Sequence, residues 1–236
     1  MLFYDDFRSY VAAQTRLLDD LEAANIPEVG VIVDVFGPAE NQDMAANPGR
    51  HSVTQRVPEL MVDCAGIDGD RHRGLTRPST TREGALYRNT AVAIANRRQL
   101  FAVSPHECQL LSQKLQVEVT PQLLGANLCI ARRDGEEFYL SDIPTNTYRV
   151  IGDPDAAEMP RPPVATLIQY LQQKGCSRTG RALATAYDDG DLTERFVDNA
   201  EFRRGILCGV EYPADQPTAL RAGQLVFFKF PVGACY

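Results

Sequence analysis

The stretch VPELMVDCAGIDGDRHRG spans Val57–Gly74 and changes character halfway along. Its first part, Val57–Cys64, is short and apolar, which predicts a buried strand. Its second part, GIDGDRHRG (Gly66–Gly74), holds three glycines together with acids, arginines and a histidine. Glycine tolerates positive φ, so this part predicts a tight loop. Loops that a rigid scaffold holds are common places for binding and catalysis. The loop is therefore either a solvated hairpin turn or one wall of a site.

Working outward, short apolar or β-branched runs that predict strands outnumber the helical patterns. The expected strands are Val29–Gly37, Val57–Cys64, Ala91–Val103, Gly125–Ile130, Glu136–Leu140, Thr147–Ile151, Val164–Leu171, Ile206–Tyr212 and Gln224–Phe230. The expected helices cover residues 3–24, 104–115, 120–125, 175–187 and 193–202, the last capped by Thr193. Because the helices lie between non-adjacent strands, we predict a mostly β, barrel-like α+β fold with peripheral helices. Residues 1–26 form an N-terminal amphipathic extension and residues 27–236 a single domain.

Composition and charge limit the classes of function. The chain has 236 residues and a formal net charge of −7, which argues against nonspecific binding to nucleic acid or to an anionic membrane. Of its 24 basic residues, only Lys114, Lys174 and Lys229 are lysines. Arginines cluster between Arg71 and Arg98. Because the guanidinium fork suits oxyanions, this cluster indicates a site for a small anionic ligand or cofactor.

The N-terminal residues do not resemble a signal peptide, and no run of residues is apolar for long enough to span a membrane. The six cysteines form no C-x-x-C pair. We therefore expect a cytoplasmic protein with reduced thiols and without a zinc or iron–sulfur motif.

Cys176 differs from the other cysteines in its surroundings. Cys64, Cys129 and Cys208 lie in apolar runs, where an inert buried thiol is the default. Cys176 lies instead at a predicted helix N-terminus, beside Lys174, Arg178 and Arg181. A helix dipole and nearby cations lower the pKa of a thiol. Cys176 could then be a nucleophile, a persulfide carrier or a soft-metal ligand, or merely a small residue where a helix begins.

The Gly66–Gly74 loop does not match two well-known ligand loops. Counting a calcium-binding EF-hand from Asp68 places Arg73 at the position that requires glycine and Ser79 at the position that requires glutamate. A phosphate-binding loop would need a different spacing of glycine and lysine.

Several motifs together resemble a known family. They are GIDGDRHRG, the arginine pair Arg97-Arg98, SPHE (Ser104–Glu107), GANL (Gly125–Leu128), Ile143-Pro144, Cys176, RRGILCGVEY (Arg203–Tyr212) and AGQLVFF (Ala222–Phe228). In this order they resemble the MOSC domain, the C-terminal module of molybdenum-cofactor sulfurases, over Glu28–Phe230. The resemblance implies a mostly β, barrel-like fold.

The resemblance also implies sulfur and molybdenum chemistry. It implies that Cys176 carries sulfur as a persulfide or binds molybdenum or its pterin cofactor, with sulfur transfer or molybdenum-dependent reduction as the activity. It implies a sulfur donor or a redox partner. The cofactor-binding residues that follow from it are Asp68, Asp70, Arg71, His72, Arg97, Arg98, Asn127, Arg178, Arg203 and Arg204.

The chain departs from the family pattern at two places. Gly175 stands where the family has proline before the cysteine, so we expect a less rigid loop, and GANL lacks the family's glutamate. Family descriptions also attach pyridoxal phosphate to this domain, but no lysine context supports it.

Two other functions stay open. One is a non-catalytic anion- or cofactor-binding module in which Cys176 is a bystander. The other is a Cys–His hydrolase that uses Cys176 and His72.

Overall fold

The computed structural model describes residues 28–39, 53–79, 92–143, 145–201, 203–214 and 216–229. Its centre is a closed barrel of seven strands. In spatial order the strands are β13 (Leu225–Lys229), β9 (Tyr148–Gly152), β10 (Ala165–Gln172), β11 (Ile206–Tyr212), β7 (Leu100–Val103), β8 (Leu128–Ala131) and β1 (Glu28–Pro38). β1 pairs back onto β13 and closes the barrel. The β7–β8 pair is parallel, whereas the other pairs of the barrel are antiparallel. The predicted mostly β, barrel-like fold is thus confirmed.

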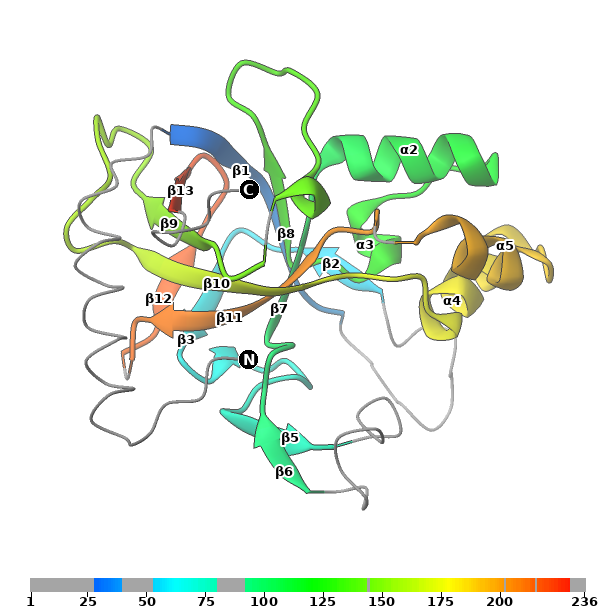
Figure 1. Cartoon of the computed structure of the whole chain (residues 1–236), viewed down its shortest axis with the longest axis horizontal. Helices are drawn as coiled ribbons and strands as arrows, with labels where there is room; N and C mark the ends of the chain where they lie inside the picture. The colour runs from blue at the N-terminus through cyan, green and yellow to red at the C-terminus, as the bar shows by residue number, and fades with distance from the viewer. Residues whose placement is uncertain are drawn as a thin grey trace, which may run out of the picture.

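Smaller sheets and the helices surround the barrel. β2 (Thr54–Arg56) pairs with β1, and β3 (Leu60–Asp63) lies between β12 (Thr218–Leu220) and β4 (Gly66–Ile67). β5 (Thr76–Pro78) pairs with β6 (Ala93–Ala95). The helices are α2 (Pro105–Leu115), α3 (Pro121–Leu124), α4 (Ser177–Tyr187) and α5 (Leu192–Asn199), with the 3-10 turn η3 (Leu140–Asp142). The four α-helices gather on one side of the barrel, and the β5–β6 pair lies below it in this view (Figure 1).

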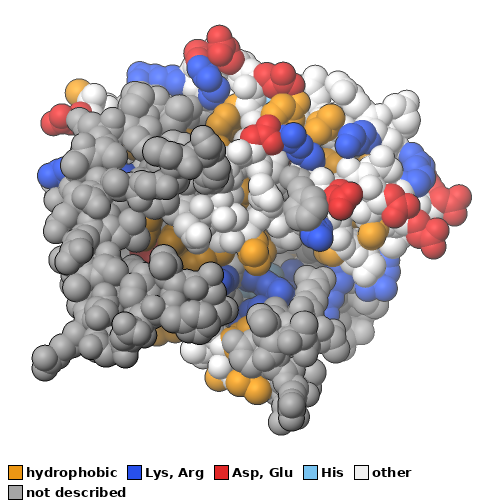
Figure 2. Space-filling model, in the orientation of Figure 1, with side chains coloured by type: hydrophobic (Ala, Val, Ile, Leu, Met, Phe, Trp, Pro, Cys, Tyr) orange, Lys and Arg blue, Asp and Glu red, His pale blue; other side chains and the backbone are white. Residues whose placement is uncertain are grey.

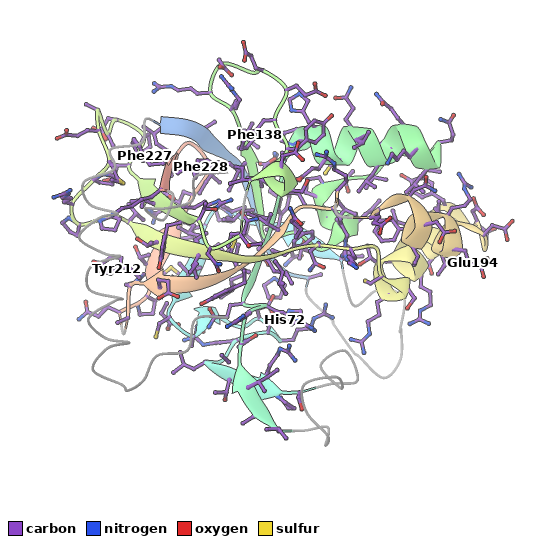
Figure 3. All side chains as sticks on the ribbon, viewed as in Figure 1. His72, Phe138, Glu194, Tyr212, Phe227 and Phe228 are labelled. Atoms are coloured by element: carbon purple, nitrogen blue, oxygen red, sulfur yellow. The ribbon has the colours of Figure 1, made fainter. Side chains whose placement is uncertain are left out.

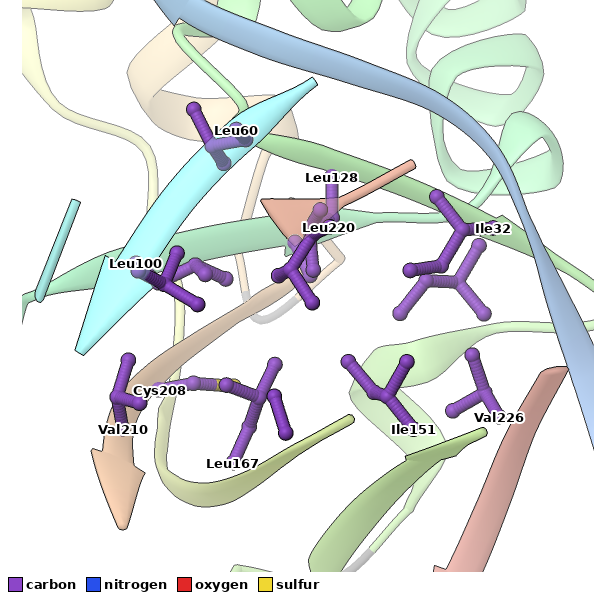
Figure 4. Packing of buried hydrophobic residues seen from close by; sticks show 14 of the residues in the cluster. Ile32, Leu60, Leu100, Leu128, Ile151, Leu167, Cys208, Val210, Leu220 and Val226 are labelled. Atoms are coloured by element: carbon purple, nitrogen blue, oxygen red, sulfur yellow. The ribbon is translucent and has the colours of Figure 1, made fainter. Parts of the chain in front are cut away.

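Strand β7 explains how the barrel and the helices share one core. Successive side chains of a strand point to opposite faces. Leu100 and Ala102 belong to the cluster that fills the barrel, whereas Phe101 and Val103 belong to the cluster under the helices. The barrel cluster is seen from close by in Figure 4, with Leu100 among its labelled side chains. β7 is therefore buried on both faces, which accounts for its continuous apolar sequence.

Local sequence accounts for the helix ends near the candidate site. Ser104 accepts a hydrogen bond from the Glu107 backbone N–H, and the Glu107 side chain accepts from the Ser104 N–H, as in a capping box. Thr120 caps α3 through the backbone N–H of Leu123. α5 begins after Asp191, so the prediction that Thr193 caps it was wrong.

Several predicted strands and helices differ from those in the structure or lie outside the described residues. The predicted strand Ala91–Val103 divides into β6 and β7, because residues 96–99 leave the strand and the side chains of Asn96 and Gln99 bond to the Gly66–Gly74 loop. Residues 136–139 form no strand, and the chain enters η3 there. The predicted helix at residues 3–24 lies outside the described residues. Within the described part of the chain, no helix has the length and apolar character that crossing a membrane requires.

Candidate functional site

Cys176 occupies the N-cap position of α4. Its backbone is extended, and its carbonyl oxygen accepts the hydrogen bond of the Gly180 N–H at 3.0 Å. The preceding residue, Gly175, packs so closely on α5 that an added Cβ would lie 2.7 Å from the carbonyl oxygen of Val197. The expectation that Gly175 loosens this loop was therefore wrong, because close backbone packing against α5 is what requires the glycine. The thiol is consequently held at a defined place, half-buried at the helix N-terminus.

Arg204 supplies the cation next to this thiol. Its guanidinium donates to the Sγ of Cys176 at 3.4 Å and to the carbonyl oxygen of Leu124 at 2.8 Å. It also donates to the Oγ1 of Thr179 at 2.5 Å, and this hydroxyl lies 3.4 Å from the Cys176 Sγ. The side chain is 5% exposed and lies against the ring of Phe101, at 5.1 Å from its centroid. Its position is thus fixed by partners on several sides.

These contacts change the acidity of the thiol. Burial raises the pKa of Cys176, but the charge of Arg204 and the hydrogen bonds from Thr179 and Arg204 outweigh it and lower the pKa from 9.0 to about 7. At the strand cysteines nothing outweighs burial, which raises the pKa of Cys129 to about 12 and that of Cys208 to about 11. The predicted contrast with Cys176 is therefore present for Cys129 and Cys208, whereas the prediction that Cys64 is buried was wrong, because that thiol is half-buried. A thiolate is the nucleophilic and sulfur-accepting form of cysteine.

The Gly66–Gly74 loop is anchored by two buried side chains that follow β6. The Asn96 amide donates to the carbonyl oxygens of His72, at 2.6 Å, and Gly74, at 2.9 Å. The Gln99 amide donates to the carbonyl oxygen of Cys64 at 2.8 Å and accepts from the Val210 backbone N–H. These hydrogen bonds hold the backbone of the loop, and at its tip the side chains of Asp68, Arg71 and His72 are exposed.

The tip of the loop brings charge toward Cys176. The Oδ1 atom of Asp70 accepts from the His72 backbone N–H at 2.6 Å and lies 3.2 Å from its ring nitrogen. Burial raises the pKa of Asp70, but these bonds and the charge of Arg71 outweigh it, so the pKa is lowered. The pKa of Arg71 is lowered by desolvation and by the charge of Arg178, against the opposing effects of Asp70 and Cys176. Arg71 is thus close enough to Arg178 and to Cys176 for their charges to affect it.

Basic side chains also gather on the surface of the molecule. Figure 2 shows Lys and Arg side chains gathered in a hollow near the middle of the face. Figure 3 places His72, and with it the Gly66–Gly74 loop, in the same part of the view.

Of the other predicted arginines, only Arg204 contacts the thiol within the described residues. Arg97 lies over the ring of Tyr170 at 5.1 Å, and the Arg98 backbone N–H donates to Asn96. Arg203 forms an ion pair with Asp142, so Arg204 alone of this pair contacts the thiol.

Asn127 and Asp68 take no part in the contacts of the thiol. The Asn127 amide is buried and bonds to the backbones of Phe101 and Phe36, which ties β7 to β1. Asp68 is exposed, and its backbone N–H donates to the carbonyl oxygen of Met61.

Two of the predicted chemistries find no support in the geometry. Within the described residues, no hydrogen bond joins His72 to Cys176, because the His72 ring bonds to Asp70 and the thiol to Arg204 and Thr179. The Cys–His hydrolase therefore has no dyad. The same part of the chain contains no group of three His, Cys, Asp or Glu side chains that could hold a metal ion.

Sequence reasoning missed three residues of the site: Thr179, Asn96 and Gln99. Thr179 stands three residues after the helix cap, a spacing at which a hydroxyl can reach back to the first turn. Asn96 and Gln99 flank the arginine pair inside a segment that looked like a continuous strand. Buried amides in a predicted strand are a signal that they bond to backbone groups elsewhere.

Comparison with known proteins gives one relative in sequence and several in fold. No family model matches the chain. A Bacillus subtilis protein named "Putative metal-sulfur cluster biosynthesis proteins YuaD" is 31% identical over 169 residues, which is 68% of this chain and 77% of that protein. The crystal structure of YuaD superposes with a TM-score of 0.67 and 25% identity, covering 87% of this chain and 99% of that one.

A more distant structure shares the fold alone. YiiM from Geobacillus stearothermophilus superposes with a TM-score of 0.50 and 12% identity, covering 87% of this chain and 78% of that one.

These findings correct the family assignment. The assignment of residues 27–236 to the MOSC family was wrong, because no family model matches the chain and the family that the comparisons show is that of YuaD. Because the identity of 31% extends over more than two thirds of both proteins, the chain belongs to the family of YuaD.

Proposed function

We propose that this protein is a sulfur carrier in which Cys176 holds sulfane sulfur as a persulfide and passes it on. The observation that carries the proposal is the contact of the Arg204 guanidinium with the Cys176 Sγ at the N-terminus of α4. A buried cation and a helix dipole both stabilise a negative sulfur, whether it belongs to a thiolate or to the terminal atom of a persulfide. A thiol with a pKa of about 7 is half ionised at neutral pH and needs no separate base.

The printed name of YuaD refers to metal–sulfur cluster biosynthesis, and a step that moves sulfur would serve such chemistry. We extend that role to this chain as part of the proposal. The proposal also includes a sulfur donor or redox partner and a cytoplasmic location. All five cysteines in the described part of the chain are free thiols, as a reducing compartment would keep them.

Loss of persulfide in a Cys176 variant is the direct test. Purified protein is reduced, incubated with colloidal elemental sulfur, desalted and assayed for cyanide-labile sulfur, with intact-mass analysis to count the sulfur atoms gained. We expect the wild-type protein to take up sulfur and Cys176→Ala to take up none. The matched control is Cys64→Ala, since Cys64 is a half-buried thiol whose Sγ contacts the carbonyl oxygen of Ala214. Equal uptake by wild-type protein and Cys176→Ala would remove the proposal.

A second candidate is a non-catalytic module that binds an anion, molybdate or a molybdenum cofactor among them. The observation in its favour is that Arg71, from the Gly66–Gly74 loop, and Arg178, from the first turn of α4, affect each other by charge. Equilibrium dialysis with molybdate separates the two candidates. Binding that survives Cys176→Ala and disappears in Arg71→Ala supports this module with Cys176 as a bystander, whereas binding that needs Cys176 speaks against it.

A further inference from the structure

The helix that positions Cys176 also carries two exposed arginines. Arg178 and Arg181 follow the thiol within the first turns of α4, and both side chains are exposed. Residues three apart in a helix are neighbours on one face, with about 5–6 Å between their Cβ atoms. The buried face of α4 consists of other residues, Thr179, Gly180, Ala182 and Leu183. The two guanidinium groups therefore share the solvent-facing side of the helix.

These two arginines lack the carboxylate partners that other arginines of the protein have. Ion pairs with Asp or Glu are formed by Arg56, Arg73, Arg132, Arg195, Arg203 and Arg221. Among the described residues, neither Arg178 nor Arg181 forms an ion pair or a side-chain hydrogen bond. The neighbouring helix α5 carries Glu194 and Asp198, yet no ion pair links the two described helices. The charge of both arginines is thus available to a partner.

The place of the arginines is unfavourable for the helix itself. A helix N-terminus carries about half a positive charge, so it favours carboxylates and disfavours cations. α2 follows this rule, with Glu107 in its first turn and Lys114 in its last. α4 has no acidic residue in its first turn and no basic residue in its last. Cations that oppose the dipole of α4 indicate a role in binding rather than in folding.

The helix under these arginines is held rigidly against α5. An added Cβ at Gly175 would lie 2.7 Å from the carbonyl oxygen of Val197, and one at Gly180 would lie 2.8 Å from that of Thr193. Both glycines therefore let the two helices approach closely. The side chain of Val197 is 38% exposed beside this contact. A fixed arginine pair with an apolar side chain nearby suits a protein interface, where arginine is enriched.

We propose that the exposed face of α4 docks an acidic segment of the partner protein that takes sulfur from Cys176. This inference rests on the proposed sulfur-carrier function and names the kind of partner. Carboxylates match the guanidinium fork, and opposite charges on two surfaces speed their encounter. Because the net charge of −7 repels an acidic partner elsewhere, Arg178 and Arg181 also orient it toward the thiol. A nucleic acid would meet that repulsion along a much longer surface.

The transfer needs no external oxidant or reductant. A thiolate of the partner attacks the outer sulfur of the Cys176 persulfide, and a new S–S bond forms while the S–S bond of the persulfide breaks. Cys176 leaves as a thiolate with the bonding electron pair, next to the guanidinium of Arg204. The partner then holds the persulfide, and the total charge is the same on both sides.

The test measures sulfur transfer from the full-length protein to synthetic peptides. The protein, in a Cys64→Ala background, is loaded with colloidal elemental sulfur. Each peptide has one central cysteine flanked by four glutamates, four glutamines or four lysines, and mass spectrometry follows the sulfur it gains. Dividing each rate by that of the glutamine peptide cancels changes in the persulfide itself. We expect the glutamate-to-glutamine ratio to fall about threefold in Arg178→Gln and in Arg181→Gln, as for one exposed ion pair.

Charge reversal gives a sharper result. In the double variant Arg178→Glu and Arg181→Glu, the lysine peptide should become a better acceptor than the glutamate peptide. Both positions are exposed, and glutamate suits a helix N-terminus, so the Tm of this variant should not fall below that of the wild-type protein.

Arg221→Gln is the matched control. Arg221 is exposed and its loss changes the net charge equally, but it follows β12, which lies across the barrel from α4 (Figure 1). The peptide ratios of this variant should match those of the wild-type protein.

The outcomes separate this inference from the function on which it rests. Sulfur transfer with the same peptide ratios in the wild-type protein, the glutamine variants and the charge-reversed variant overturns the inference and leaves the sulfur carrier standing. A thymidine oligonucleotide that slows transfer to all three peptides, with no preference for the glutamate peptide, would assign the face to nucleic acid and also overturn it. Failure of the wild-type protein to load sulfur overturns the sulfur carrier itself.

Discussion

At the scale of single residues, the acidity of Cys176 gives the first prediction. Its pKa is lowered to about 7, so the reactive thiolate is present above that pH and is lost as the pH falls through it. We expect the rate of alkylation by iodoacetamide to rise to a plateau with a midpoint near this value. Arg204→Gln removes the charge that lowers the pKa of Cys176. Burial, which raises the pKa, is then opposed only by the contact with Thr179, so the midpoint should move upward by about one unit or more.

The measurement is a pH profile in a Cys64→Ala background, followed by mass spectrometry. Arg204→Lys, which keeps a charge but not the guanidinium fork, is the comparison variant. A midpoint that stays unchanged in Arg204→Gln would contradict the assigned role.

Gly175 gives a second prediction at this scale. A methyl group at this position would lie 2.7 Å from the Val197 carbonyl oxygen, so Gly175→Ala must push the Cys176 loop away from α5. We expect a loss of about 1–3 kcal/mol in the free energy of unfolding, as in other overpacked sites. The alkylation midpoint of Cys176 should also rise as its contact with Arg204 weakens.

Gly190→Ala is the control, because an added Cβ there meets no atom within 4 Å. Similar losses of stability in both variants, measured by urea unfolding, would refute the close-packing argument.

Residues could be predicted where a local pattern carries the chemistry. Cys176 stands out in sequence because cap-type and basic residues surround it. The choice between Arg203 and Arg204 could not be made, because adjacent residues point in different directions and only the fold shows which one reaches the thiol. The roles of Asn96 and Gln99 were hidden for the same reason, since their partners lie 22 to 111 residues away in the chain.

At the scale of elements, the capping box of α2 supports a third prediction. Ser104 is fully buried, and its side chain accepts the Glu107 backbone N–H at 3.1 Å. Ser104→Ala removes this acceptor and should cost about 1 kcal/mol of stability. Ser177→Ala serves as control, because Ser177 is exposed at the start of α4 and does not cap it. Thermal unfolding followed by circular dichroism checks both, and a loss no larger than that of the control would be evidence against the cap.

The start of α2 was predictable at this scale because four consecutive residues, Ser104–Glu107, carry its capping box, whereas the start of α5 was misplaced. The residues at which strands begin and end were harder to predict. Residues 91–103 look uniformly strand-like, yet the chain leaves the β-conformation at Asn96 to anchor a distant loop. A contact of that kind has no local signature.

At the scale of the whole molecule, the two faces of β7 give a fourth prediction. Leu100 packs inside the barrel and Phe101 under the helices, so neither layer can lose its packing alone. We expect one cooperative transition, in which the helical far-ultraviolet signal and the exposure of the buried Cys208 thiol share a midpoint. Phe101→Leu, which alters the helix side only, should lower both midpoints by the same amount.

The control is Val197→Ala, at a position 38% exposed on α5, which should leave both midpoints nearly unchanged. Loss of helical signal at a temperature where Cys208 is still protected would contradict the shared core. The barrel itself was predictable from the excess of short strands, but the order of its strands was not, since closure joins β1 to β13 from opposite ends of the chain.

The contact between Arg204 and Cys176 also makes the thiol a reporter of the native state. On unfolding, Cys176 loses this neighbour and its pKa returns toward 9.0, so that near pH 7 its ionised fraction falls from about a half to about one in a hundred. Cys208 changes in the opposite sense, because unfolding exposes a thiol that the barrel conceals. The large difference in reactivity between these two cysteines should therefore disappear on denaturation, so a single labelling experiment could distinguish folded from unfolded molecules without any added probe.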